Sequence, residues 1–331
     1  MTLSTPTTPS PAAIVDIAVG YMGAKQLFAA RRIGLFEALA DGPLTVVDLS
    51  AKLPVSQKMT HILADSMNAL GLLDRSAGSY RLTDESAAYL TGDRADLDLG
   101  DFLSFLGGIS YGHWLQFDRT VDTTEPGDLD LQGERWNDFM AGVMNYNALH
   151  ARMLLGAFDF HGHRSMLDLG GLASGFSIAA MQSNPDLHTT FVFDPAAVES
   201  VVKELAAAGL TDRAEVVGAE TPNAQPAGDH DLVMVNHVVH RFDAEQNAQI
   251  LRNARAAART GARLVLLDFF LDDDDRQRRL DALHAGEYLV IDGTVVYPES
   301  EVRGWLEAAG WAHVETVALP GCPRILVAEA R

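Results

Sequence analysis

The chain has 331 residues, nearly half of them hydrophobic, which is enough for two folded domains with a core in each. Its 45 acidic and 25 basic residues give a formal net charge of −20, so we expect neither nucleic acid nor an anionic membrane as a partner. The single cysteine, Cys322, excludes a disulfide framework and fits a reducing cytoplasm. We find no apolar run that approaches the roughly 20 residues of a membrane helix.

The N-terminal part of the chain carries the patterns of a small helical domain. Residues 1–11 are rich in Ser, Thr and Pro and lack an apolar core, which predicts a disordered tail and not a signal peptide. Apolar side chains then recur at helical spacing, and a short hairpin pattern follows. The predicted elements are helices over 12–39 with a break near Gly34, over 46–52 and over 56–70, then a hairpin over 73–83. This order is typical of a winged helix, which we assign to residues 12–96.

A winged helix often binds DNA, but the charges of this one argue against that function. The helix predicted over 56–70 carries only Lys58 and His61 as possible cations, whereas a helix that grips phosphates needs several Lys or Arg. The apolar residues of the segment 14–39 exceed what so small a domain needs for its own core. We therefore expect the N-terminal helices to pack against a second copy of the chain, as a homodimer.

Further helices are predicted over residues 97–155, between this domain and the rest of the chain. They carry aromatic and methionine side chains, among them Trp114, Phe139, Met140 and Met144. Such side chains most often form a plain core, which is the interpretation we favour. Because Met and aromatic rings also adapt to flat organic molecules, the alternative is a lid over a bound substrate, and Met144 fits both interpretations.

A glycine-bearing turn between two predicted strands marks a nucleotide-type domain. The first strand, 165–169, leads into the turn Gly170–Gly175, which is followed by a helical pattern and by a second strand that stops at Asp194. Glycines let backbone N–H groups approach a ligand, and an acid at the next strand end can accept hydrogen bonds from ribose hydroxyls. We assign residues 156–331 to an α/β domain with a doubly wound, mostly parallel sheet.

A histidine pair follows another buried strand on the same side of this sheet. A neutral His240 in that position can take a proton from a substrate, and Asp268 or Asp292 could fix its tautomer. For His237 we favour a capping role at the strand end. Because no Cys, Glu or third His with usable spacing adjoins the pair, we expect no metal site. The four acids Asp272–Asp275 are expected to form a solvated loop.

The order of these motifs resembles that of the small-molecule O-methyltransferases that use S-adenosylmethionine, especially the bacterial natural-product type. The resemblance extends from about Ala12 to the end of the chain. It rests on these stretches: Leu35–Leu39 with Gly42–Thr45, Leu70–Leu73, Tyr80–Thr83, Leu167–Gly171, Phe193 with Asp194, and His237–Asp243. It implies a Rossmann-like methyltransferase domain over 156–331, preceded by a dimerising winged helix.

The resemblance also implies roles for individual residues. The catalytic candidates are His240 as general base, with Asp268 and Asp292 as the acids beside it. The S-adenosylmethionine contacts would come from Asp168, Gly170, Gly171 and Asp194. A small-molecule substrate would lie against Trp114, Phe139, Met140, Met144 and His237. The implied reaction is methyl transfer to a hydroxyl group of that substrate.

Some positions depart from the family pattern. Leu172 and Ser174 stand where the family has glycines, Ala219 stands where an acid usually lies near the adenine, and Arg241 replaces an acid beside the base. Two alternatives therefore stay open. One is a cofactor-independent enzyme on the same scaffold, which closes a ring by intramolecular displacement or catalyses an elimination. The other is a non-catalytic assembly partner.

Overall fold

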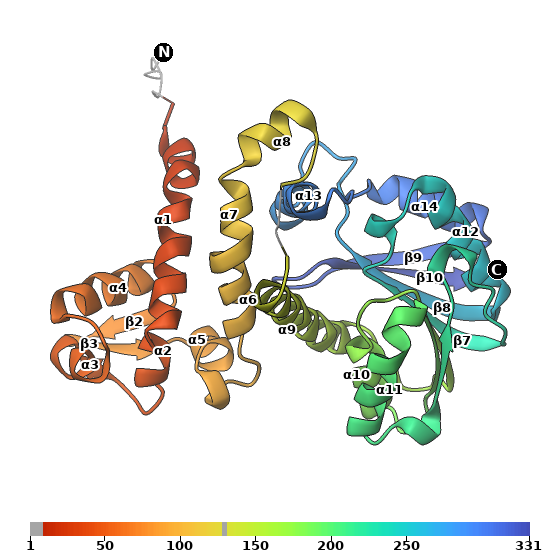
Figure 1. The fold of residues 1–331 in the computed structure, drawn as a ribbon, viewed down its shortest axis with the longest axis horizontal. Helices are drawn as coiled ribbons and strands as arrows, with labels where there is room; N and C mark the ends of the chain where they lie inside the picture. The colour runs from red at the N-terminus through yellow and green to blue at the C-terminus, as the bar shows by residue number, and fades with distance from the viewer. Residues whose placement is uncertain (1–8, 128–130) are drawn as a thin grey trace, which may run out of the picture. The chain divides into compact units, whose positions relative to one another are not determined.

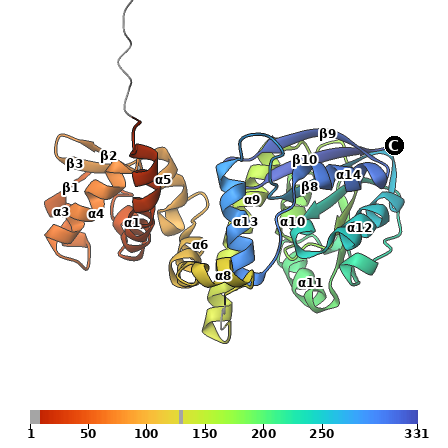
Figure 2. The same ribbon diagram turned by 90° about the horizontal axis from the view of Figure 1, so that it is seen from above.

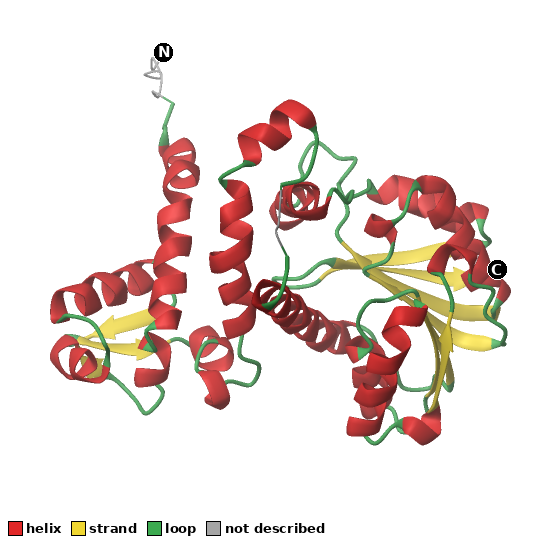
Figure 3. Ribbon diagram, viewed as in Figure 1, coloured by secondary structure: helices red, strands yellow, loops and turns green. Residues whose placement is uncertain are grey.

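The computed structural model describes residues 9–127 and 131–331, which form two compact units. The first unit comprises the described residues up to Ile109 together with Trp136–Gly142. The second comprises those of Ser110–Arg135 and Val143–Arg331. Most of the tail predicted over 1–11 lies outside the described residues. Figure 1 labels the elements of each unit, Figure 2 shows them from above, and Figure 3 separates helices from strands by colour.

The first unit has the helices and the hairpin that the sequence predicts. Its elements are α1 (Ala12–Arg32), α2 (Leu35–Ala38), β1 (Leu44–Thr45), α3 (Val46–Lys52), α4 (Gln57–Ala69), β2 (Leu73–Ser76), β3 (Ser79–Leu82), α5 (Asp84–Tyr89), η1 (Gly92–Arg94) and α6 (Gly100–Phe105). The break between α1 and α2 falls at Gly34, whose φ of 77° favours glycine. Thr45 and Ser56 cap α3 and α4, because their hydroxyls accept from backbone N–H groups in the first turn. The three strands pair in the order β1-β3-β2.

Helix α1 presents apolar side chains to solvent along its N-terminal half. Ile14 and Ile17 are 74% and 78% exposed, whereas Ala30 near its C-terminal end is buried. Among the described residues, α1 is the one helix long and apolar enough to cross a membrane by length and composition. The expectation that no segment approaches this length is therefore wrong. The match is weak evidence for a membrane span, because the core helix of a soluble protein and a signal sequence pass the same test.

The second unit is an α/β domain. Its elements are α7 (Tyr111–Trp114), α8 (Phe117–Thr123), most of α9 (Glu134–Ala157), β4 (Ser165–Leu169), α10 (Gly175–Ser183), β5 (His188–Phe193), η3 (Pro195–Ala197), α11 (Val198–Ala207), η4 (Thr211–Arg213), β6 (Ala214–Gly218), η5 (Thr221–Asn223), β7 (His230–Asn236), η6 (Val239–Arg241), α12 (Ala244–Ala256), β8 (Ala258–Asp268), α13 (Arg279–Asp292), α14 (Glu299–Ala308), β9 (Trp311–Ala318) and β10 (Arg324–Ala330). A π-helical segment, η2 (Leu106–Ser110), precedes α7.

The seven strands of this unit form one sheet in the order β6-β5-β4-β7-β8-β10-β9. The pairs from β6 through β8 are parallel, and β10 runs antiparallel to both β8 and β9. Chain order therefore reverses between β4 and β7, which is the switch point where doubly wound sheets bind ligands beyond the strand C-termini. The fold class predicted from the sequence is confirmed.

Helices cover both faces of this sheet. Figure 1 shows α10 and α11 on one side and α12 and α14 on the other. Strand β7 is buried along its whole length, which explains its unbroken apolar run. Alternate residues of β7 and β8 join Ile250 of α12 and Leu306 of α14 in a single buried cluster. The same parallel strands hold the loops at their C-terminal ends in fixed positions.

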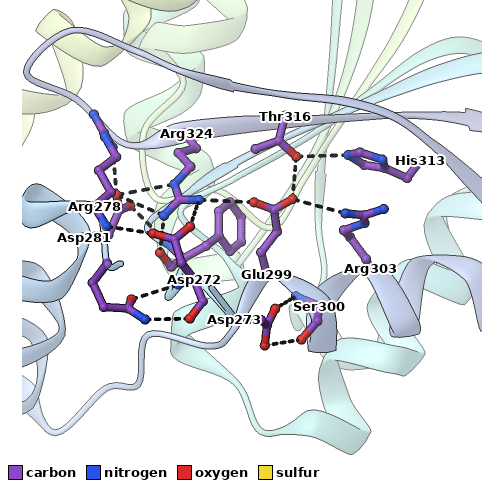
Figure 4. Close-up of polar contacts among 12 residues, drawn as sticks. Asp272, Asp273, Arg278, Asp281, Glu299, Ser300, Arg303, His313, Thr316 and Arg324 are labelled. Atoms are coloured by element: carbon purple, nitrogen blue, oxygen red, sulfur yellow. Dashed lines mark hydrogen bonds and ion pairs between the residues drawn. The ribbon is translucent and has the colours of Figure 1, made fainter. Parts of the chain in front are cut away.

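A buried ionic cluster lies at the C-terminal end of β8, where this strand meets α13, α14 and the first residue of β10. Figure 4 shows Arg324 between the carboxylates of Asp272, Asp281 and Glu299. Its guanidinium nitrogens lie 2.5 Å from Asp272 Oδ1, 3.2 Å from Glu299 Oε2 and 3.4 Å from Asp281 Oδ2. Asp281 is fully buried and also accepts from Arg278 at 2.9 Å. Asp272 is thus not the solvated acid we expected, and its hydrogen bond to Arg324 lowers its pKa.

This cluster predicts a large stability difference between two arginine variants. We expect Arg324→Met to lower the free energy of unfolding by about 3 kcal/mol, because it leaves buried carboxylates without their main cation. Arg303→Met is the matched control, since Arg303 binds the same Glu299 at 3.7 Å but is half-exposed, and it should cost less than about 1 kcal/mol. Urea unfolding followed by circular dichroism measures both. Equal losses in the two variants would show that the buried cluster adds nothing beyond a surface ion pair.

Candidate active site

The polar residues predicted from the sequence gather at the C-terminal ends of the parallel strands of the second unit. Gly170 follows β4, Asp194 follows β5, and His237 and His240 follow β7. Asp268 is the last residue of β8. Because these strands run side by side and in the same direction, their ends share one edge of the sheet.

The turn after β4 is built around a glycine that no other residue could replace without strain. Gly170 has a φ of 78°, and a Cβ placed on it would collide with the methyl group of Thr221. A Cβ on Gly171 would come within 3.2 Å of the Phe193 ring. Thr221 and Phe193 therefore leave little space for a side chain at either glycine. At these two positions the turn offers main-chain groups, which fits a ligand bound by the backbone.

Asp168, the acid of this motif, is fully enclosed within the sheet. Its Oδ2 accepts a hydrogen bond of 2.6 Å from the Ser177 hydroxyl of α10. Burial raises the pKa of Asp168 to about 7, and the Ser177 hydrogen bond opposes only part of this shift. This hydrogen bond links the end of β4 to α10, the helix that follows the turn. Asp194 at the end of β5 is exposed instead, and it accepts from the backbone N–H of Ala196.

Each residue that departs from the family pattern has a defined place around this turn. The Leu172 side chain is 54% exposed, so half of its surface faces solvent. The Ser174 hydroxyl donates to Glu204 of α11, and Ala219 packs against the apolar cluster under the sheet. Arg241 donates to the carbonyl of Gly170 at 2.8 Å and so braces the turn from the His240 loop. The residues present fit an S-adenosyl ligand in this turn.

His240 and Asp268 form the closest acid–imidazole pair at this edge of the sheet. Nδ1 of His240 lies 2.9 Å and 3.0 Å from the two carboxylate oxygens of Asp268. Asp268 is fully buried, which alone would raise its pKa, but the neighbouring His240 and His237 and the N–H of Phe269 hold that pKa below its ordinary value. A carboxylate can only accept, so the proton of His240 sits on Nδ1 and its Nε2 is the nitrogen able to take a proton.

The second acid predicted beside His240 is not in contact with the imidazole. Asp292 is the exposed last residue of α13, and its Oδ1 accepts from the backbone and the hydroxyl of Thr294. The backbone of Val295 donates to the carbonyl of His240 at 3.3 Å, so Asp292 lies nearby in the fold. The helix ending at Gly293 turns its carboxylate toward Thr294, and the structure gives His240 one hydrogen-bonded acid, Asp268.

Sequence reasoning missed several side chains that surround the His240 pair. His150 of α9 places its Nδ1 3.0 Å from Nε2 of His237. The ring of Tyr288, from α13, lies 4.5 Å from that of His240 between centroids, and Phe269 stacks on His284. His150 comes from α9, His284 and Tyr288 come from α13, and Phe269 follows β8. No motif spacing in the sequence predicts that they meet.

Burial keeps the inner histidines neutral. It lowers the pKa of His237 to about 4, although Asp268 pulls in the other direction. His150 is fully buried, and its pKa falls well below the ordinary value for the same reason, with His237 and His284 adding to the effect. The Nε2 of His150 is buried without a hydrogen-bond partner. Donor atoms of His237, His240 and Asp268 all lie within 4.8 Å of one another, a grouping that could hold a metal ion.

The predicted substrate contacts divide between the two units. Trp114, Met144 and His237 belong to the second unit, where the indole N–H of Trp114 donates to Glu287 of α13. Phe139 and Met140 belong to the first unit, where Phe139 packs edge-on against Phe105 with ring centroids 5.5 Å apart. Phe139 thus contributes to a core contact there, and a joint role of these residues around one substrate stays a prediction.

Comparison with known proteins identifies the architecture. Residues 128–312 match the O-methyltransferase domain family, and residues 15–92 match the O-methyltransferase dimerisation domain. The 3-hydroxy-5-methyl-1-naphthoate 3-O-methyltransferase of Streptomyces sahachiroi is 31% identical over 323 residues, covering 94% of this chain and 93% of its own. The tetracenomycin polyketide synthesis 8-O-methyl transferase of Streptomyces glaucescens is 24% identical, with 94% of each chain covered.

Solved structures agree along the whole chain. The S-adenosylmethionine-dependent methyltransferase SibL superposes with a TM-score of 0.86 at 26% identity, covering 97% of this chain and 99% of that one. Human N-acetylserotonin methyltransferase, solved with its cofactor, has the same fold, with a TM-score of 0.77 at 22% identity over 99% of each chain. The chain therefore belongs to the S-adenosylmethionine-dependent O-methyltransferase family.

Proposed function

We propose that this protein transfers a methyl group from S-adenosylmethionine to a hydroxyl of a small aromatic natural product, with His240 as general base. The main support for the proposal is the hydrogen bond between His240 Nδ1 and Asp268. It holds the imidazole as the Nδ1–H tautomer, whose Nε2 can accept a proton. The aromatic substrate class is supported by the relative from Streptomyces sahachiroi, which acts on a hydroxylated naphthoate.

The chain's own residues divide the work between binding and proton removal. Gly170 and Gly171 would bind the cofactor through the main chain, with Asp168 behind the turn and Asp194 at the neighbouring strand end. The bound cofactor supplies a methyl group on a positively charged sulfur. His240 Nε2 takes the hydroxyl proton as the substrate oxygen becomes nucleophilic, and the Asp268 carboxylate stabilises the imidazolium that results. Most of the rate would come from holding the two reactants in line.

Substitution of the base tests this assignment. We expect His240→Ala to lower kcat by about 10²- to 10⁴-fold, because the proton acceptor is lost. Asp268→Asn should also lower kcat, since an amide can hold the imidazole in the wrong tautomer. The matched control is His313→Asn, a half-buried histidine on β9 that bonds Thr316, and it should keep the wild-type rate. A folded His240→Ala variant that turns over at the wild-type rate would remove His240 from the mechanism.

Calorimetric titration with S-adenosylmethionine and S-adenosylhomocysteine tests cofactor binding. We expect micromolar affinity for both, and less than a tenfold change in Leu172→Gly, because much of the Leu172 side chain faces solvent. Gly170→Ala should abolish binding, since its Cβ would collide with Thr221 and strain the turn. If the folded wild-type protein gives no heat at millimolar ligand, the cofactor role is lost and the cofactor-independent ring closure or elimination takes its place.

We also propose that the protein is a homodimer that pairs through its N-terminal helices. The exposed apolar residues of α1 lie within or beside the segment that matches the dimerisation domain. Light scattering should therefore give twice the chain mass of 35.7 kDa, and Ile17→Glu, which puts a charge on the 78% exposed position, should shift the mass toward the monomer. A wild-type monomer at micromolar concentration contradicts the proposal.

A further inference from the structure

We propose that His237, His240 and Asp268 form a binding site for a first-row transition-metal ion of the zinc type, and that occupation of this site switches the base off. Two imidazoles and one carboxylate are the ligand set that zinc and its neighbours accept in sites with an open position. The three donor atoms lie within 4.8 Å of one another, and one of the residues is fully buried. The argument from sequence spacing overlooked this set because its carboxylate comes from the neighbouring strand.

The distances between donors show how little the site must change to hold an ion. His240 Nδ1 and the nearer oxygen of Asp268 are 2.9 Å apart, and His237 Nδ1 is 4.0 Å from the other oxygen. Ligands at zinc distances of about 2.0–2.1 Å sit roughly 3.3 Å from one another in a tetrahedron. His237 Nδ1 must therefore approach the Asp268 carboxylate by about 0.7 Å, with the fourth position left for water.

The surroundings of His237 hold it in a conformation suited to this role. Its φ of 53° is rare for a residue with a side chain, and its backbone N–H donates to the carbonyl of Leu267 at 2.8 Å. Its Nε2 lies 3.0 Å from Nδ1 of the buried His150. A metal-binding histidine usually uses its second ring nitrogen in such a bond, which fixes the tautomer and leaves the first nitrogen to face the metal.

Metal binding and base catalysis compete for the same imidazole. A neutral imidazole carries one proton, which lies on Nδ1 of His240 while Asp268 accepts it. If Nδ1 gives its lone pair to a metal, that proton must move through solvent to Nε2. Nε2 then has no lone pair in the ring plane with which to accept a proton from a hydroxyl. A bound ion would thus inhibit methyl transfer without touching the cofactor turn.

The experiment measures binding and inhibition separately. The chelator-treated full-length protein is titrated with Co²⁺, followed by its visible absorption, and with Zn²⁺, followed by calorimetry. We expect one ion per chain with a Kd of about micromolar or tighter, and visible bands typical of a four- or five-coordinate cobalt ion. Absence of a saturable site below millimolar concentrations would overturn the proposal.

Variants locate the site. His237→Asn should weaken binding at least tenfold, and Asn is a fitting replacement because it tolerates a positive φ. Asp268→Asn should do the same, and it keeps the test decisive if the first variant does not fold. The matched control is His161→Ala, which removes the exposed His161–Asp159 pair at 2.8 Å and should leave binding unchanged. Wild-type affinity in a folded His237→Asn or Asp268→Asn variant, or loss of binding in His161→Ala, would overturn the assignment.

The predicted inhibition rests on the proposed role of His240 as base, whereas the binding does not. Zn²⁺ should inhibit methyl transfer at the concentrations that fill the site, and a chelator should restore the rate. If one ion binds at the mapped site but the rate is unchanged, the metal site stands and the role of His240 as base is wrong. The two proposals therefore fail in distinguishable ways.

Discussion

The buried carboxylate of Asp268 is the constraint on which this site depends. A charge with no solvent contact is stable only if nearby donors replace its water. Here the His240 imidazole and the N–H of Phe269 supply that replacement and lower the pKa of Asp268. The same hydrogen bond also acts on His240. Because the buried carboxylate needs a donor, it fixes the orientation of the imidazole and places its proton on Nδ1. Asp268 and His240 come together because β8 ends beside the loop that follows its parallel neighbour β7.

The glycine turn after β4, where we propose that the cofactor binds, depends mainly on backbone conformation. The main-chain shape at Gly170 depends on a positive φ and on the Thr221 methyl that fills the space beside it. Side chains at Leu172 and Ser174 project away from that shape, one toward solvent and one toward Glu204. Both side chains are therefore accommodated without displacing Gly170 or Gly171 from the turn. Arg241 adds a brace, since its guanidinium holds the carbonyl of the glycine that remains.

The sequence was sufficient for most of the fold and for the central pair of the site. Strands such as β7 are easy to predict, because a strand covered on both faces has an unbroken apolar run at its centre. The meeting of His240 and Asp268 followed from topology, since parallel neighbours end at one edge. His150 was not predictable, because it lies 87 positions from its partner His237 and comes from a helix with no matching motif. The hydrogen bonds of Asp292 were not predictable for a local reason, because the end of α13 places its carboxylate beside the Thr294 hydroxyl.

The geometry that supports the proposed role of His240 as base also brings together the donors of the proposed metal site. A base needs its Nδ1 fixed by an acid and its Nε2 open to the substrate, whereas an ion needs two neutral imidazoles and an acid close together. Asp268 takes part in both the proposed base pair and the proposed metal site, whereas His237 takes part only in the metal site. It bonds His150 and lies 4.0 Å from Asp268, too far to share in the hydrogen bond that holds His240. Replacing His237 should therefore remove the metal site while the His240–Asp268 hydrogen bond remains. A His237 variant thus distinguishes metal binding from base catalysis.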